Sequence, residues 1–194
     1  MFNDKAKSHD LVTAALATAK RMDERAAAKG YYTILCFDKD GKLKWEDTAP
    51  NLVVNVGLQD MNAKYFKGAT YTAAWYIGLI TGPGSGTTIA AGDQMNSHAG
   101  WAENTGYSNA TRPAATFGTA AATNPSSQTN SASPAAFSIN ASSTIAGAFL
   151  VSDSTKGGTT GILFSASDFT SPNDRVVVSG DTLNVTYTFS LTAT

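Results

Sequence analysis

The sequence contains little cysteine and histidine, and over most of its length little charge. The one cysteine among 194 residues, Cys36, excludes an intramolecular disulfide and a cysteine-based zinc site. Only two histidines are present, which leaves few candidates for metal ligands or general bases. The formal net charge of −1 argues against nucleic-acid binding, because such proteins neutralise phosphates with clustered Lys and Arg. We therefore expect no bound metal, no cofactor and no nucleic-acid partner.

The sequence also lacks a long apolar run. No stretch approaches the roughly 18 residues needed to span a bilayer. The first ten residues, MFNDKAKSHD, have no apolar core of the signal-peptide type. From these two absences we expect synthesis in the cytoplasm and no association with a membrane.

Charge divides the chain into two parts. Residues 1–68 hold 11 of the 14 Lys and Arg and 9 of the 15 Asp and Glu, whereas the polar residues of the remainder are mostly Thr, Ser and Asn. Short hydroxyl side chains suit turns and the solvated faces of strands. This composition is typical of extracellular or virion β-proteins more than of cytosolic enzymes.

Residues 8–29 carry the start and stop signals of a helix. Ser8 is a candidate N-cap, Asp10 lies in the first turn, and Lys29 precedes Gly30. The apolar stripe is narrow, so this helix is expected to dock onto its own domain or onto a partner protein. We therefore predict that residues 1–29 form an N-terminal anchor. The candidate docking residues are Leu11, Ala15, Arg21, Met22 and Arg25.

A hairpin and a second helix follow. Tyr32, Ile34 and Cys36 occupy every second position, as on one face of a strand. A turn containing Gly41 then leads to Leu43 and Trp45, which is a strong hairpin pattern. Cys36 is expected to be buried and inert.

A helix is predicted over 51–67, with an apolar stripe of Val54, Leu58, Met61 and Tyr65. Gly57 weakens that helix by about 1 kcal/mol relative to Ala, which predicts close packing against a strand.

The remainder of the chain has the pattern of an antiparallel β-sandwich. TYTAAWYIGLIT (70–81) predicts a buried strand with Tyr71, Trp75, Ile77 and Leu79 on one face. Short strands at about ten-residue spacing, separated by Gly, Asn and Ser turns, continue to the end of the chain. Residues 119–133 are low in complexity and predict a long exposed loop.

The predicted fold is therefore mainly β with N-terminal helices. An Ig-like or jelly-roll-like sandwich over residues 30–194 is preceded by a helix, a hairpin and a second helix.

The final strand is the most regular of these. Its alternate positions are all apolar: Leu183, Val185, Tyr187, Phe189 and Leu191. Such a face predicts a core strand, because a chain terminus normally frays unless it is tied down. The attachment segment is therefore expected at the other end of the chain.

One region concentrates polar and aromatic residues, between Asp93 and Tyr107. In the sequence His98 stands between the carboxylates Asp93 and Glu103, which suits a metal ligand or the general base of a hydrolase, but no nucleophile is paired with it. A second hypothesis is a carbohydrate-binding surface, and a third is an irregular loop fixed by packing of Trp101. We expect no catalytic residues. The candidate ligand surface contains Trp101, Glu103, Asn104 and Tyr107.

The order of the segments resembles a family of small virion proteins of tailed bacteriophages. The resemblance covers residues 30–194 and is carried by GKLKWEDTAPNLVVNVGLQDMNAKYFKG, YTAAWYIGLITG, MNSHAGWAENTGYSNATRPAATFG, SASPAAFSINASSTIAGAFLVSDSTKGGTTGILFSASDF and VVVSGDTLNVTYTFSLTAT. It implies a non-enzymatic structural protein, a capsid-decoration or head-fibre component, located in the virion. The implied partners are the major capsid protein or a connector or tail protein.

Two further expectations accompany this resemblance. A tail or neck appendage that binds a host receptor or glycan is the alternative function. A homo-oligomer is expected because the Ala- and Gly-rich stretches around 110–122 and 135–148 suit close packing between copies.

Overall fold

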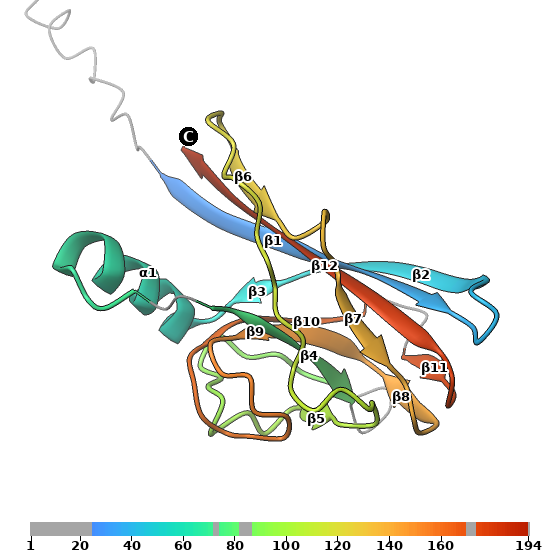
Figure 1. Ribbon diagram of the computed structural model, residues 1–194. Coiled ribbons are helices and arrows are strands. Elements are labelled where there is room, and N and C mark those ends of the chain that lie inside the picture. The colour runs from blue at the N-terminus through green and yellow to red at the C-terminus, as the bar shows by residue number, and fades with distance from the viewer. Residues whose placement is uncertain (1–24, 72–73, 82–86, 170–173, 194) are drawn as a thin grey trace, which may run out of the picture.

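The computed structural model describes residues 25–71, 74–81, 87–169 and 174–193. The fold of these residues is mainly β, with several antiparallel sheets and one α-helix in the described part of the chain (Figure 1). Of the predicted N-terminal anchor, Leu11, Ala15, Arg21 and Met22 lie outside the described residues. No helix in the described ranges is long and apolar enough to cross a membrane.

The first sheet is built around the two longest strands, which run antiparallel along their whole length. Ala26 pairs with Ala193 at one end and Phe37 with Thr182 at the other. The strand order is β2-β1-β12-β6, and β7 also pairs with β12. The sheet contains β1 (Ala26–Phe37), β2 (Leu43–Pro50), β6 (Ser126–Thr129), β7 (Ala135–Ser138) and β12 (Thr182–Ala193).

The predicted hairpin and the predicted final strand are both confirmed. In the hairpin, the carboxylate of Asp38 accepts backbone N–H bonds of 2.9 Å from Asp40 and Lys42, and Gly41 has a φ of 78°. In β12, alternate residues from Leu183 to Tyr187 are buried, whereas the expected burial of Leu191 is wrong, since it is exposed. Burial therefore decreases toward the C-terminal end of β12.

The second sheet has the strand order β3-β10-β9-β4-β5. Its central strand β9 is buried at every position, which requires covering on both faces. A separate pair of short strands, β8 and β11, lies beside it. The bounds are β3 (Leu52–Val53), β4 (Tyr76–Thr81), β5 (Ala102–Asn104), β9 (Gly147–Val151) and β10 (Leu163–Asp168), with β8 (Ser143–Ile145) and β11 (Arg175–Val177) in the pair.

The two sheets share one hydrophobic core. Between them, the hydroxyl groups of Tyr32 on β1 and Ser165 on β10 lie 2.8 Å apart, and the ring of Tyr187 lies 4.6 Å from that of Tyr32. Burial raises the pKa of both tyrosines. The core includes Ile34, Leu183 and Val185 from the first sheet and Ile77, Leu79, Ala148, Leu150 and Phe164 from the second.

Several small residues of 135–148 pack within this chain, although Ala136 and Ala141 are exposed. Ala135, Ala146 and Ala148 are buried in the core, and a Cβ at Gly147 would collide with the backbone of Ser167 on the neighbouring strand. Their composition therefore serves contacts between strands of one copy, and this stretch no longer supports the expected homo-oligomer.

The helix α1 (Asn55–Lys67) confirms the predicted second helix, although it begins four residues later than 51 because β3 precedes it. A Cβ at Gly57 would collide with the carbonyl oxygen of Phe164 on β10, so the predicted close approach to a strand is correct. The expectation that Tyr65 faces the core is wrong: its side chain is 84% exposed.

Three boundary predictions are wrong. The predicted helix over 8–29 cannot extend through residues 26–29, because these residues pair with 190–193 of β12. The predicted loop over 119–133 contains β6, whose backbone pairs with the outer part of β12. The predicted strand over 70–81 begins only at Tyr76, and Tyr71 is exposed. In the first two cases pairing with a distant segment decides the structure, and local sequence does not encode that pairing.

Cys36 is buried as predicted. Burial, together with the nearby carboxylate of Asp181, raises the pKa of the Cys36 thiol to about 11, so the reactive thiolate is scarce at neutral pH.

Candidate functional site

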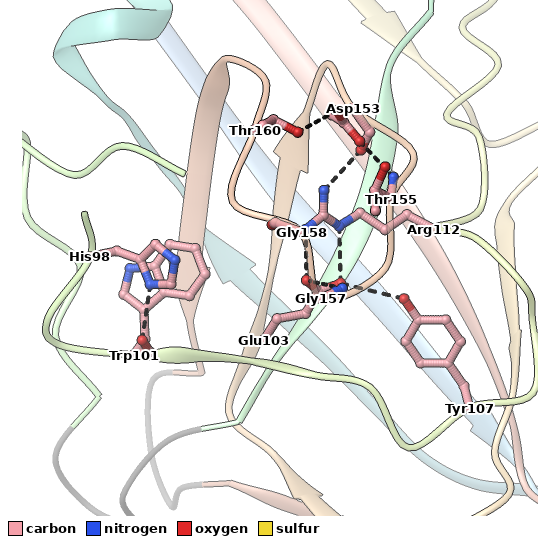
Figure 2. Close-up of polar contacts among 10 residues, drawn as sticks. All are labelled: His98, Trp101, Glu103, Tyr107, Arg112, Asp153, Thr155, Gly157, Gly158 and Thr160. Atoms are coloured by element: carbon pink, nitrogen blue, oxygen red, sulfur yellow. Dashed lines mark hydrogen bonds and ion pairs between the residues drawn. The ribbon is translucent and has the colours of Figure 1, made fainter. Parts of the chain in front are cut away.

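The predicted ligand surface lies around β5, where Glu103 is held by Arg112. The two nitrogens Nε and Nη2 of Arg112 donate to the two carboxylate oxygens of Glu103 at 2.9 and 2.7 Å (Figure 2). The Arg112 side chain is fully buried and that of Glu103 is 7% exposed. Two matched hydrogen bonds between ionised groups are among the strongest polar contacts in proteins.

The same arginine also holds the loop between β9 and β10. Its Nη1 donates to the carbonyl of Asp153 at 2.9 Å, and its Nη2 donates to the carbonyl of Gly158 at 2.7 Å. The backbone N–H of Gly157, which has a φ of 72°, donates to Glu103 at 2.9 Å. We call this set, Glu103, Arg112 and the loop 152–161, the clasp.

Two further groups close the clasp. The ammonium of Lys156 donates to the carbonyls of Tyr107 and Asn109 at 2.9 and 2.8 Å and lies 4.7 Å from the centre of the Tyr107 ring. The carboxylate of Asp153 accepts a bond of 2.6 Å from the Thr160 hydroxyl and another from the backbone N–H of Thr155 (Figure 2). Both bonds lower the pKa of the Asp153 carboxyl, the one from Thr160 more than the one from Thr155, and the resulting pKa is about 2.

Of the four predicted ligand-surface residues, Glu103 and Tyr107 meet, with the Tyr107 hydroxyl 3.4 Å from Glu103, whereas Trp101 lies apart from them (Figure 2). Their side chains do not form an exposed surface. Trp101, Asn104 and Tyr107 are all buried. The Asn104 amide donates to Ser143 at 3.0 Å and accepts from the backbone of Gly106. Burial, followed by the charge of Glu103, raises the pKa of Tyr107. The prediction of an aromatic sugar-binding surface is wrong for these residues, because they pack inside the chain.

His98 and Asp93 form a separate cluster around Trp101. The imidazole of His98 stacks on the Trp101 ring at 3.8 Å, and its Nδ1 lies 3.0 Å from the Trp101 carbonyl (Figure 2). Asp93 accepts bonds from the Trp101 indole at 2.9 Å and from the Ala90 backbone at 3.0 Å. His98 and Asp93, two of the residues considered for a hydrolase, thus hold Trp101 in place. This agrees with the hypothesis of an irregular loop fixed by packing of Trp101.

A groove of about 1050 Å³ lies elsewhere, between α1 and the outer ends of β1 and β12. Its lining is mainly apolar and includes Met61, Trp75, Ala114, Phe117, Phe164 and Phe189. Edge-to-face ring contacts fix the floor, with Phe164 lying 5.5 Å from Trp75 and 5.4 Å from Phe189. The charged residues Asp60 and Lys64 also line it, and they pair with each other at 2.7 Å.

Three exposed aromatic side chains border this groove. Tyr65 and Phe66 lie in the last turn of α1 and are 84% and 77% exposed, and Tyr71 is 74% exposed. Exposed apolar surface of this kind is uncommon in isolated soluble proteins and marks sites of association. We call Tyr65, Phe66 and Tyr71 the aromatic rim.

The groove lies where the predicted anchor joins the fold. Ala26, the first residue of β1, lines the groove, and Arg25 directly precedes it and is exposed. In Figure 1, the start of β1, the C-terminal end of β12 and α1 all lie on the same side of the molecule, opposite the turn between β1 and β2.

Sequence reasoning missed both Arg112 and the aromatic rim. A signal for Arg112 was present, because it is the only Lys or Arg between Lys67 and Lys156. A solitary cation in a charge-poor segment needs a carboxylate partner when it is buried. The aromatic rim was missed because the apolar stripe of the helix predicted Tyr65 on its buried face.

The described residues contain no group of three or more His, Cys, Asp or Glu side chains that is placed to hold a metal ion. Comparison with models of known protein families, with curated proteins and with solved structures found no match to this chain.

Proposed function

We propose that this chain is a structural component of a tailed-bacteriophage virion, a capsid-decoration or head-fibre protein without enzymatic activity. The observation that carries the proposal is the contrast between two surfaces. The polar residues of the clasp bond to one another, while the aromatic rim and groove leave apolar surface for a partner at the end where the anchor begins.

The architecture that we propose is a β-sandwich. Two antiparallel sheets contribute to one core, and β12 lies in the middle of one of them. Such a fold needs no cofactor. The clasp supports this role, because a loop held by a buried arginine resists local opening.

Attachment to the particle is assigned to the N-terminal end. The candidate contacts are Leu11, Ala15, Arg21, Met22 and Arg25, and the candidate partners are the major capsid protein or a connector or tail protein. A weak contact repeated on a regular lattice gives strong overall binding, so a short anchor is sufficient.

Particle binding provides the test. Virions from a phage that carries this gene are purified on a density gradient, and the chain is sought by mass spectrometry and by gold-labelled antibody on the head, neck and tail. We expect it in the virions, at many copies. Its presence in the lysate but absence from purified virions would refute the proposal.

The anchor is tested separately with particles that lack this protein. The full chain and a variant without residues 1–24 are mixed with such particles and sedimented. We expect the full chain to sediment with the particles and the truncated chain to remain in the supernatant while keeping the β-sheet circular dichroism of the full chain. Equal binding by both would assign attachment to residues 25–194.

The alternative function, a neck or tail appendage that binds a receptor or glycan, loses its proposed residues. Trp101, Asn104 and Tyr107 are buried, and both carboxylate oxygens of Glu103 bond to Arg112. No other observation favours this alternative.

A further inference from the structure

The aromatic rim is held in place by the way α1 ends. Gly68 adopts the left-handed conformation, with a φ of 64°, and its backbone N–H bonds to the carbonyl of Ala63. This cap ends the helix at Lys67, one residue after Phe66. The rings of Tyr65 and Phe66 lie 4.9 Å apart in an edge-to-face arrangement. The two rings therefore stand together on a fixed element beside the groove.

The groove and the rim match each other in chemistry. The groove lining is mainly apolar, and its paired charges Asp60 and Lys64 lie 2.7 Å apart, so it has no strong net charge. The rim is aromatic and uncharged. A surface that offers both a projecting apolar knob and an apolar groove is self-complementary, because a two-fold axis makes each contact twice.

We infer that the groove of one copy receives the Tyr65 and Phe66 side chains of a second copy of this chain. An aromatic side chain buries roughly 150–250 Å² when fully covered. At exposures of 84%, 77% and 74%, the three rim residues together offer on the order of 350–600 Å² per copy. Two copies then cover about 700–1,200 Å², which reaches the roughly 1,000 Å² of a specific interface even before the groove walls are counted.

This inference does not depend on the proposed virion role, because it concerns the purified chain alone. Two other occupants are outcomes of the test. One is residues 1–24 of the same copy, because Ala26, which follows them in the sequence, lines the groove. The other is a different protein.

Sedimentation velocity of the full chain, from about 1 to 200 μM, measures the association. We expect the wild-type chain to form an oligomer whose population rises with concentration, and a Tyr65→Ser/Phe66→Ser variant to stay monomeric throughout. The matched control is Val176→Ser on β11, an exposed apolar residue that does not line the groove, and it should associate like the wild type. Unchanged circular dichroism of all three verifies that they fold.

A disulfide-trapping experiment locates the contact. Because Cys36 is fully buried, a cysteine introduced on the surface is the accessible thiol. Mixing Phe66→Cys with Ala114→Cys, which lies in the groove lining, should give a cross-linked dimer under mild oxidation. Mixing Val176→Cys with Ala114→Cys should give at least tenfold less.

Several results would overturn the inference. They are a wild-type chain that is monomeric at every concentration, an oligomer unaffected by the rim substitutions, and equal cross-linking in both mixtures. A monomer that associates only after residues 1–24 are removed would also overturn it, and would assign the groove to that segment of the same copy.

Discussion

The clasp and the groove differ in how their side chains are satisfied. In the clasp, the buried guanidinium of Arg112 bonds to Glu103 and to two backbone carbonyls of a distant loop. At the groove, the Tyr65 and Phe66 rings touch each other and are otherwise largely exposed. The polar groups of the clasp thus bond to one another, whereas the apolar rings of the rim remain exposed. Chemical richness in a sequence therefore does not by itself mark the working surface.

The largest effect is expected from breaking the clasp. Arg112→Ala leaves the Glu103 carboxylate buried without its partner, so the free energy of unfolding should fall by about 3–5 kcal/mol. The control is Arg175→Ala, since the pair of Arg175 with Asp47 at 2.8 Å is partly exposed and should contribute about 1 kcal/mol or less. Urea unfolding followed by circular dichroism measures both.

A double variant tests the cause of that loss. Replacing both members, as Glu103→Leu/Arg112→Met, removes the unpaired charge and should recover part of the stability lost in Arg112→Ala. Equal losses for Arg112→Ala and Arg175→Ala would show that burial of the pair is not what matters.

A smaller effect is expected where α1 approaches β10 to form the groove wall. In an open helix, Gly→Ala gains about 1 kcal/mol. At Gly57, however, a Cβ would collide with the backbone of Phe164, so Gly57→Ala should instead cost about 1–3 kcal/mol. Gly92→Ala, with no atom near its Cβ position, is the control and should change stability by less than about 0.5 kcal/mol. Thermal unfolding distinguishes them, and a stabilised Gly57→Ala chain would contradict the packing.

Alternation within a strand was predictable, since it depends only on the strand's own residues. The faces of β1 and the inner half of β12 follow from period-two apolar patterns, and the approach at Gly57 follows from a glycine inside a helical stripe. The alanines at 26–28 have high helix propensity, yet they lie in β1 because β12 extends beside them. Propensity is overridden there by pairing between segments more than 160 residues apart.

The clasp was not predictable from local pattern, because its partners come from separate segments. Glu103 on β5 and Arg112 are nine residues apart, and the pairing of β9 with β4 brings the loop at 153–158 to them. The prediction that Trp101 and Tyr107 lie on an exposed surface depends on residue type alone. Aromatic residues next to carboxylates occur in cores as well as at binding sites, so residue type alone does not distinguish the two.

The clasp should also respond weakly to acid through Asp153. Its pKa is lowered to about 2 by the bonds from Thr160 and Thr155, below the ordinary value of about 3.9. A lowered pKa in the folded state contributes stability above pH 4 that is lost as the pH falls toward 2. Solvent reduces the effect to about 1 kcal/mol or less.

Urea unfolding at pH 5 and pH 2.5 tests this contribution. Thr160→Val removes the hydroxyl donor and should lower stability at pH 5 more than at pH 2.5. The adjacent exposed Thr159→Val serves as the control and should show the same change at both values. A pH-independent effect of Thr160→Val would assign its bond no role in the titration of Asp153.

The smallest effect on the stability of a single copy is expected at the rim. Tyr65 and Phe66 are exposed, so Tyr65→Ser/Phe66→Ser should change the free energy of unfolding by less than about 0.5 kcal/mol at 1 μM protein. Association stabilises only the folded state, so wild-type stability should rise with protein concentration while that of the variant stays constant. The loss in Arg112→Ala should persist at every concentration, because the clasp lies within one copy. Thermal unfolding from 1 to 200 μM protein distinguishes the rim variant from Arg112→Ala. If the rim variant differed from wild type by the same amount at every concentration, the two rings would stabilise the single copy and not the association.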